Sequence, residues 1–170
     1  PFISAGPATG PFPPFEEKVL SDDGTTIIFT DSYGRTCRSF KDHTSMPEWI
    51  DFPVKSPADL QRVIDERFDI SLREARRRPD WAAKTATWRQ DPENRDALLF
   101  LDGGCYYGHL RNLCGVEYAS YLFYDAPALV EELLERICLF CLDGIAQAQD
   151  AGLTIDYLGF GEDIAYKTST

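Results

Sequence analysis

The chain has 170 residues, of which 44% are hydrophobic and 13% aromatic, enough to bury one sizeable core in a single domain. Its formal net charge is -11 and its sequence pI is about 4.5. This negative field repels phosphate backbones and anionic lipid surfaces, so the composition argues against nucleic acid and membranes as partners.

Five cysteines form an odd set without the spacing of a disulfide framework, and we expect no secretory leader. We therefore expect a reducing, cytoplasmic location. Charged residues interrupt the apolar runs well short of the ~20 residues that cross a bilayer. Because the sequence starts at Pro1 and stops at Thr170 just after a strand pattern, we also expect a fragment of a larger domain.

The N-terminal third predicts an antiparallel meander. Residues 1–14 are rich in proline, which denies helices and central strands their backbone hydrogen bonds, so an extended lead-in is expected. Turn signals then separate three strand-like runs, residues 18–20, 25–30 and 35–40. Residues 15–55 should form this meander and a connecting loop.

A helix should begin at Ser56 and Pro57, which have the residue types of an N-cap and a first helical position. Its buried stripe consists of Leu60, Val63, Ile64 and Phe68. Residues 71–90 also predict a helix, interrupted by Pro79. We interpret the cluster of Arg73, Arg76, Arg77 and Arg78 as a solvated face.

Two apolar runs, residues 97–101 and 154–160, predict buried strands, the first covered on both faces as in a parallel sheet. A short helix is expected at about 108–114. Apolar residues at steps of three and four, from Leu129 to Ala148, predict a long amphipathic helix. Asp125 is its expected N-cap, and Gly152 is placed to end it in a left-handed turn.

This order of strands and helices predicts a parallel α/β fold. A complete TIM (β/α)8 barrel needs ~250 residues. Residues 56–170 are therefore expected to form about half of such a barrel, preceded by the antiparallel meander.

Functional groups of a (β/α) barrel lie at the carboxyl ends of its strands, which draws attention to the residues after Phe160. Glu162 and Asp163 are the expected catalytic acids, and Tyr166 and Lys167 are expected to contact substrate. One of the two carboxylates can point into the barrel mouth while the other braces a loop. The alternative is that these acids only cap the next helix.

A second candidate cluster follows the strand that ends near Leu101. Its expected substrate-binding residues are Asp102, Tyr107, His109 and Arg111. Arg111 could bind a substrate carboxylate in bidentate fashion. The alternative is that the tyrosines pack in the core and Arg111 pairs with a structural acid.

Cys138 and Cys141 have the spacing of a metal or redox motif, but both lie on the buried stripe of the long helix. Core packing is therefore the expected role. Cys105 and Cys114 lack a histidine at ligand spacing, so we expect no metal site and no cofactor within this chain.

Three passages together resemble the uroporphyrinogen decarboxylase superfamily. They are residues 46–59 (MPEWIDFPVKSPAD), 110–130 (from LRNLCG to YDAPALV) and 161–167 (GEDIAYK). The resemblance implies a TIM barrel with a small-molecule site in its mouth. It also implies a strand-end acidic position that matches Glu162 and Asp163.

The superfamily includes porphyrinogen decarboxylases, which need no cofactor, and corrinoid- or thiol-dependent methyltransferases, which use zinc. The decarboxylases have a Gly-Pro-Trp-Thr pattern and a tyrosine after the strand that matches 97–101, whereas this chain has GCYYGHL and Leu113 there. The sequence is thus more similar to the methyltransferase-like branch, and this resemblance implies that the zinc ligands would come from a part of the parent protein beyond Thr170.

The leading hypothesis is therefore a fragment of a methyltransferase whose substrate is a corrinoid, a tetrapyrrole or a methylated compound. The first alternative is decarboxylation of tetrapyrrole acetate groups. The second is a non-catalytic half-barrel that serves binding or assembly. An open half-barrel exposes a strand edge and an apolar helix face, which would favour a homodimer.

Overall fold

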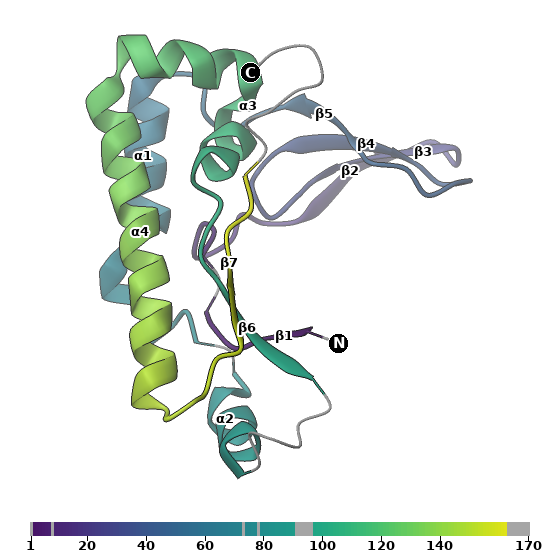
Figure 1. Ribbon diagram of the computed structural model, residues 1–170. Helices are drawn as coiled ribbons and strands as arrows, with labels where there is room; N and C mark the ends of the chain where they lie inside the picture. The colour runs from purple at the N-terminus through teal and green to yellow at the C-terminus, as the bar shows by residue number, and fades with distance from the viewer. Residues whose placement is uncertain (1, 8, 73, 78, 91–96, 163–170) are drawn as a thin grey trace.

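The computed structural model describes residues 2–7, 9–72, 74–77, 79–90 and 97–162. The fold is mixed α/β and contains two separate sheets (Figure 1). An antiparallel sheet projects to one side of the helices, and a parallel sheet runs beside the longest helix (Figure 1).

The antiparallel sheet is the predicted meander. It consists of β2 (Lys18–Asp22), β3 (Thr26–Thr30), β4 (Thr36–Phe40) and β5 (Glu48–Asp51), in sequence order. The first three strands confirm the expectation, whereas β5 was assigned to a connecting loop. Pro47 and Pro53 flank β5 but neither falls inside it, so this short edge strand pairs with β4.

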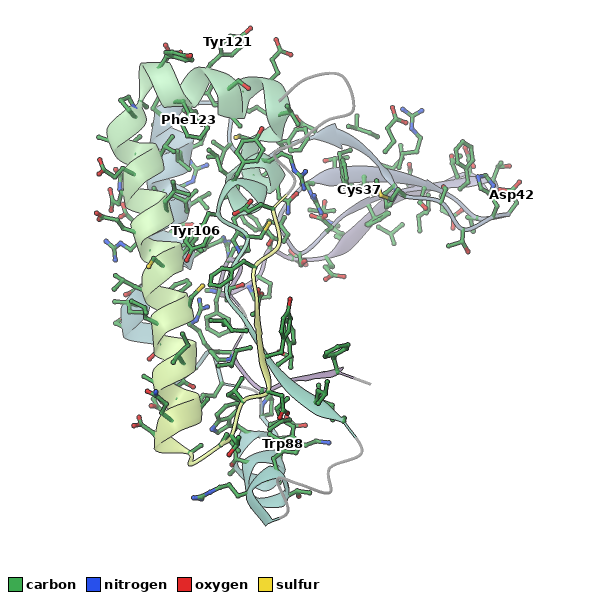
Figure 2. All side chains as sticks on the ribbon, in the orientation of Figure 1. Cys37, Asp42, Trp88, Tyr106, Tyr121 and Phe123 are labelled. Carbon is green, nitrogen blue, oxygen red and sulfur yellow. The ribbon has the colours of Figure 1, made fainter. Side chains whose placement is uncertain are left out.

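Aspartate side chains fix the two hairpin turns of the meander. Asp23 accepts hydrogen bonds from the backbone nitrogens of Thr25 and Thr26, and Asp31 does the same for Tyr33 and Arg35. Gly24 and Gly34 supply the positive φ that these turns require. The loop that carries Asp42 lies at the outer end of the sheet, away from the helices (Figure 2).

The first helix begins where the sequence predicts it. In α1 (Pro57–Arg67), Ser56 is the N-cap and its Oγ accepts a hydrogen bond from the Asp59 nitrogen at 3.2 Å. The helix predicted over residues 71–90 is confirmed after Pro79, whereas the described residues before this proline form the 3₁₀ turn η1 (Ile70–Leu72) and further turns. The helix α2 (Trp81–Gln90) starts two residues after this proline.

The third helix, α3 (Tyr106–Asp125), is longer than the expected segment 108–114. Its two helical parts meet at Gly115, whose φ of 77° breaks the regular backbone. A Cβ at this glycine would lie 3.0 Å from the Phe52 ring, so the kink also allows a close contact with the loop before α1.

The long amphipathic helix, α4 (Pro127–Asp150), is confirmed, but Asp125 is not its N-cap. Ala126 occupies that position and makes no side-chain cap bond. The end is as predicted, because Gly152 has a φ of 66° and its nitrogen donates to the Gln149 carbonyl at 2.8 Å.

The main core lies between α1, α3 and α4. Its fully buried side chains include Leu60, Ile64 and Phe68 of α1, Leu110 and Leu113 of α3, and Leu133, Ile137 and Phe140 of α4. The predicted stripes of α1 and α4 therefore face each other, and this packing holds the start of α3 against the end of the parallel sheet.

The parallel sheet has the order β1 (Phe2–Ser4), β6 (Leu98–Asp102) and β7 (Tyr157–Gly159), and all its pairings are parallel. The sequence predicted β6 but not β1, because the short run Phe2–Ser4 precedes the proline-rich part of the lead-in. As an edge strand, β1 tolerates the prolines that follow.

One face of this sheet is covered and the other is open. Leu99 and Leu101 are buried with Trp88 of α2 and Ala148 of α4, and Figure 2 shows Trp88 beneath the sheet. Leu98 and Tyr157 point to the other side and are 49% and 53% exposed. The expectations of cover on both faces of the first strand and of a buried second strand were therefore wrong within the described residues.

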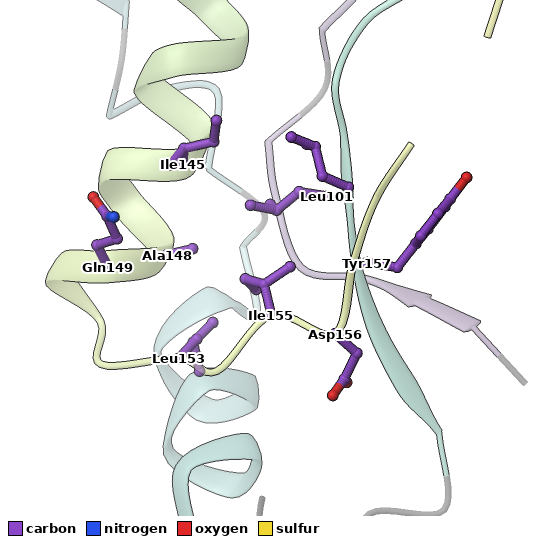
Figure 3. A pocket seen from close by; sticks show the side chains of 9 residues that line it. Leu101, Ile145, Ala148, Gln149, Leu153, Ile155, Asp156 and Tyr157 are labelled. Carbon is purple, nitrogen blue, oxygen red and sulfur yellow. The ribbon is translucent and has the colours of Figure 1, made fainter. Parts of the chain in front are cut away.

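A cavity of about 360 Å³ lies on the covered side, between the end of α4 and the sheet. Figure 3 shows Leu101, Ile145, Ala148 and Ile155 around it, whereas Tyr157 points away from α4. The three parallel strands of the described chain do not close into a barrel.

Candidate small-molecule site at the ends of the parallel strands

A second cavity, of about 620 Å³, lies at the carboxyl ends of β1 and β6. Five segments line it: the turn after β1, the β3–β4 turn, the loop after η1, the end of β6 and the first turns of α3. Among the lining residues are Thr9, Gly10, Tyr33, Arg76, Asp102 and His109. Its position agrees with the strand-end placement expected from the sequence.

Asp102 is the last residue of β6, and each oxygen of its carboxylate accepts a hydrogen bond. Its Oδ2 accepts a hydrogen bond from the Thr9 hydroxyl at 2.7 Å, and its Oδ1 accepts one from the Gly104 nitrogen at 3.0 Å. Gly104 has a φ of 100°, which turns the chain sharply after the strand. The carboxylate thus has a fixed direction at the edge of the cavity.

His109 lies one turn into α3 and is only 5% exposed. Its Nδ1 is 2.7 Å from the Tyr33 hydroxyl, and its ring stacks on Tyr33 with a centroid distance of 5.9 Å. Its Nε2 is buried and has no hydrogen-bond partner among the described residues. His109 is among the residues that line the cavity, but its Nε2 is not exposed to it.

Burial lowers the pKa of His109 from 6.5 to about 4, although Asp102 and Glu162 act in the opposite direction. The imidazole is therefore neutral at pH 7. Burial also raises the pKa of Tyr33 to about 12, so its phenol keeps its proton there. The two rings form a neutral hydrogen-bonded pair.

Arg76 brings positive charge to the cavity. It is 5% exposed, and its guanidinium lies over the Phe140 ring, 3.3 Å from the ring centre. Burial lowers its pKa to about 10, with Asp143 acting against the shift, and the group remains cationic at pH 7.

The solvated-face interpretation of the arginine cluster was therefore wrong for Arg76. Arg77 is half-buried, donates to Gln147 Oε1 at 2.9 Å and forms an ion pair with Glu74 at 2.6 Å. Arg73 and Arg78 lie outside the described residues. The sequence of the arginine run does not distinguish Arg76 from Arg77, because the packing of α4 determines which of these side chains is covered.

Glu162 holds the start of α3. Its carboxylate accepts hydrogen bonds from the backbone nitrogens of Tyr106, Tyr107 and Gly108, the last two at 3.2 and 3.3 Å. The N-cap residue Cys105 makes no cap bond with its side chain, so this distant acid takes that role. Such capping is the alternative that the sequence left open, although the capped helix precedes Glu162 in the chain.

The other expected site residues are distributed differently. Asp102 and His109 meet at the cavity, whereas Tyr107 and Arg111 are not among the described residues that line it. Tyr107 stacks with Phe123, at a centroid distance of 6.4 Å. Asp163, Tyr166 and Lys167 lie outside the described residues.

Sequence patterns missed Tyr33, Thr9 and Arg76. Tyr33 belongs to a turn motif and Thr9 to the proline-rich lead-in, and neither context indicates a site. Of the neighbouring residues, Gly10 could have indicated a close approach in the sequence. In the structure, a Cβ at Gly10 would lie 3.1 Å from the Tyr33 hydroxyl and 3.6 Å from His109. A glycine can mark such a close approach of the backbone.

Within the described residues, no three histidine, cysteine or acidic side chains gather as metal ligands. Cys141 is buried, as predicted, and Cys138 is half-buried. No helix in the described part of the chain is long and apolar enough to cross a membrane.

Comparison of the chain with protein-family models, with curated proteins and with solved structures finds no match. The site is therefore interpreted from its own geometry.

Proposed function

We propose that this chain is part of a uroporphyrinogen decarboxylase-like enzyme of the methyltransferase-like branch, and that its substrate binds in the cavity beside Asp102 and His109. The cavity at the strand ends, which Asp102, His109 and Arg76 line, is the observation that carries the proposed site. The three sequence passages that resemble the superfamily support the choice of enzyme class.

The lining suits a small molecule with an apolar body and a few polar groups. Proline and aromatic side chains, such as those of Pro11 and Phe12, supply apolar parts of the wall, and Asp102, His109 and Arg76 are among its polar residues. The carboxylate accepts hydrogen bonds, and the guanidinium binds negative charge. A corrinoid, a tetrapyrrole or a methylated compound carries groups of both kinds.

The described residues do not provide a zinc site. In this proposal zinc is therefore bound by other residues of the parent protein. The role of this chain is to bind and orient the substrate and to exclude water from the cavity.

The parent protein can be tested by metal analysis and by a thiol methylation assay. We expect bound zinc, methyl transfer, and a drop of at least about tenfold in kcat/KM for His109→Ala, which corresponds to roughly 1.4 kcal/mol. His43→Ala is the matched control, because His43 is an exposed residue next to Asp42 at the tip of the meander. A metal-free protein without methyl transfer would exclude this branch.

Tetrapyrrole decarboxylation is the second candidate, and the buried Arg76 favours it because such substrates carry several carboxylates. The assay is turnover of uroporphyrinogen by the parent protein. Turnover that falls in Arg76→Gln but not in Arg38→Gln, an exposed arginine of β4, would promote this candidate above methyl transfer.

Assembly without catalysis is the third candidate, and the open face of the parallel sheet favours it. Phe2, Leu98 and Tyr157 expose apolar surface there. We expect this chain to form homodimers in size-exclusion chromatography if the face is an assembly surface. A dimer that dissociates in Tyr157→Lys would support this role, and a monomer at all concentrations would exclude it.

A further inference from the structure

A groove of about 420 Å³ lies between α3 and α4, and it shares no lining residue with the cavity beside Asp102. From α3, Tyr106 and Phe123 line this α3–α4 groove, and Figure 2 shows both side chains beside α4. The other lining residues belong to α4 and are Pro127, Val130, Glu131, Leu134, Glu135 and Cys138. The groove is thus a second concave surface, separate from the candidate site.

The wall of the groove is largely apolar and partly exposed. Leu134 packs against the main core, and Phe123 remains 45% exposed. The apolar surface continues along α4, because Leu142 lies one turn beyond Cys138 and is 55% exposed. Between Glu131 and Leu142 the helix rises about 17 Å, so an amphipathic helix of about 12 residues matches this length.

Glu131 and Glu135 place two carboxylates at the edge of the groove. Their spacing of four puts them on one side of α4, with Cβ atoms about 6 Å apart. Both side chains are exposed, and within the described part of the chain neither forms a hydrogen bond or an ion pair. Glu132, on the neighbouring side, differs because it pairs with Arg136 at 3.3 Å.

The helix dipole does not account for these two acids. Neither lies in the first turn of α4, and the effect of the dipole falls off within that turn. Their charges are therefore available to a cationic partner at the edge of an apolar surface.

Charge decides which kind of partner fits the α3–α4 groove. A second copy of this chain is disfavoured, because α4 carries five acidic residues against one basic and the whole chain has a formal net charge of -11. Among the described helices, α2 alone carries only basic charges, Lys84 and Arg89. Its two tryptophans already pack in the chain's own core, so α2 of a second copy has no free apolar side to offer.

We propose that the α3–α4 groove binds a basic amphipathic helix of another protein. The apolar side of this helix contacts Phe123 and Leu134, and its lysines or arginines pair with Glu131 and Glu135. Helices that bind in grooves use apolar anchors at steps of three and four, and complementary charges at the edge of the groove select the partner. This protein-binding surface goes beyond the proposed small-molecule site and does not depend on the enzyme class.

Three synthetic peptides of about 12 residues test the choice of partner by isothermal titration calorimetry. The first has leucines at steps of three and four and lysines elsewhere, and the second has glutamate in place of every lysine. The third has the composition of the first, but leucine and lysine alternate as in a strand. We expect saturable binding of the first peptide alone, with one peptide per chain. Equal binding of the second or the third peptide would overturn the proposal.

A pair of double variants tests the role of the two carboxylates. Glu131→Gln combined with Glu135→Gln should weaken binding of the first peptide at least about fivefold, because two ion pairs are lost. The control is Asp65→Asn combined with Glu66→Gln, which removes the same net charge from exposed positions of α1 outside the groove. Equal weakening by the control would mean that the peptide responds only to the overall charge, and would refute the proposal.

A second pair of variants tests the apolar wall. Phe123→Ala removes an apolar anchor and should weaken binding at least about fivefold. Tyr124→Ala is its control, because Tyr124 is 87% exposed and does not line the groove. Circular dichroism checks that each variant folds. A folded Phe123→Ala that binds the peptide as tightly as the unaltered chain would contradict the proposed contact.

Size-exclusion chromatography of the unaltered chain without peptide tests the rival occupant. A dimer that dissociates in Phe123→Ala would show that a second copy fills the groove, and would overturn the proposal. A dimer that dissociates only in Tyr157→Lys would instead use the open sheet face and leave the groove free, as the proposal requires. None of these measurements involves turnover, so they fail independently of the proposed enzyme activity.

Discussion

Acidification should destabilise this protein through His109. The folded-state pKa of this group is about 4, whereas its unfolded value is 6.5. Between these pH values the unfolded chain binds more protons than the folded chain, so the free energy of unfolding falls as the pH is lowered. The stability linked to neutral His109 is present above pH 6.5 and is lost as the pH falls toward 4.

The magnitude follows from the two pKa values. Each unit of difference corresponds to about 1.4 kcal/mol, which limits the full effect to roughly 3 kcal/mol. Between pH 7 and pH 5, where most of the transition falls, the loss should be about 2 kcal/mol. Aspartates with lowered pKa values, such as Asp23 and Asp59, add their own loss mainly below the ordinary aspartate pKa of 3.8.

Urea unfolding, followed by tryptophan fluorescence at pH 7 and at pH 5, measures this loss in the unaltered chain. His109→Gln removes the titrating group, so the difference in unfolding free energy between the two pH values should shrink by about 2 kcal/mol. His43→Gln, the exposed control, should retain the full difference. An equal loss of stability on acidification in His109→Gln and in the unaltered chain would refute a role of His109 in this pH dependence.

Three further substitutions test the fold, each by the shift in unfolding free energy from urea titration. Leu133→Ala should lose about 3 kcal/mol, because this α4 side chain is fully buried, whereas Leu139→Ala on the exposed side should change stability by less than about 1 kcal/mol. Gly152→Ala should lose about 1 kcal/mol because of its positive φ, and Gly161→Ala, in open space, should be nearly neutral. Glu162→Ala should lose about 1 kcal/mol through the uncapped start of α3, and Glu162→Gln should lose less, since one acceptor oxygen remains. Equal losses within any pair would contradict the corresponding interpretation.

Structural features that depend on local interactions could be predicted from the sequence. The hairpin turns depend on aspartate and glycine within a few residues, the start of α1 depends on Ser56 and Asp59, and the stripe of α4 depends on its own periodicity. Each of these features involves groups close together in the chain, so the residue types alone indicate the structure.

The site depended on contacts between distant segments. Thr9 meets Asp102 and Tyr33 meets His109 although 93 and 76 residues separate them. The sequence placed Asp102 and His109 near a strand end, but it gave no sign that the meander and the lead-in would contact them. The packing of α3 on α1 and α4 determines which residues contact Asp102 and His109.

The sequence by itself determined that this chain forms a meander, amphipathic helices and short parallel strands, because hydrogen bonding and periodicity act over a few residues. Only the tertiary structure decided that Arg76 is buried, that Glu162 caps α3 from 56 residues away, and that one sheet face stays open. Burial and long-range capping depend on which surfaces meet, and that information is spread over the whole chain and contained in no single motif.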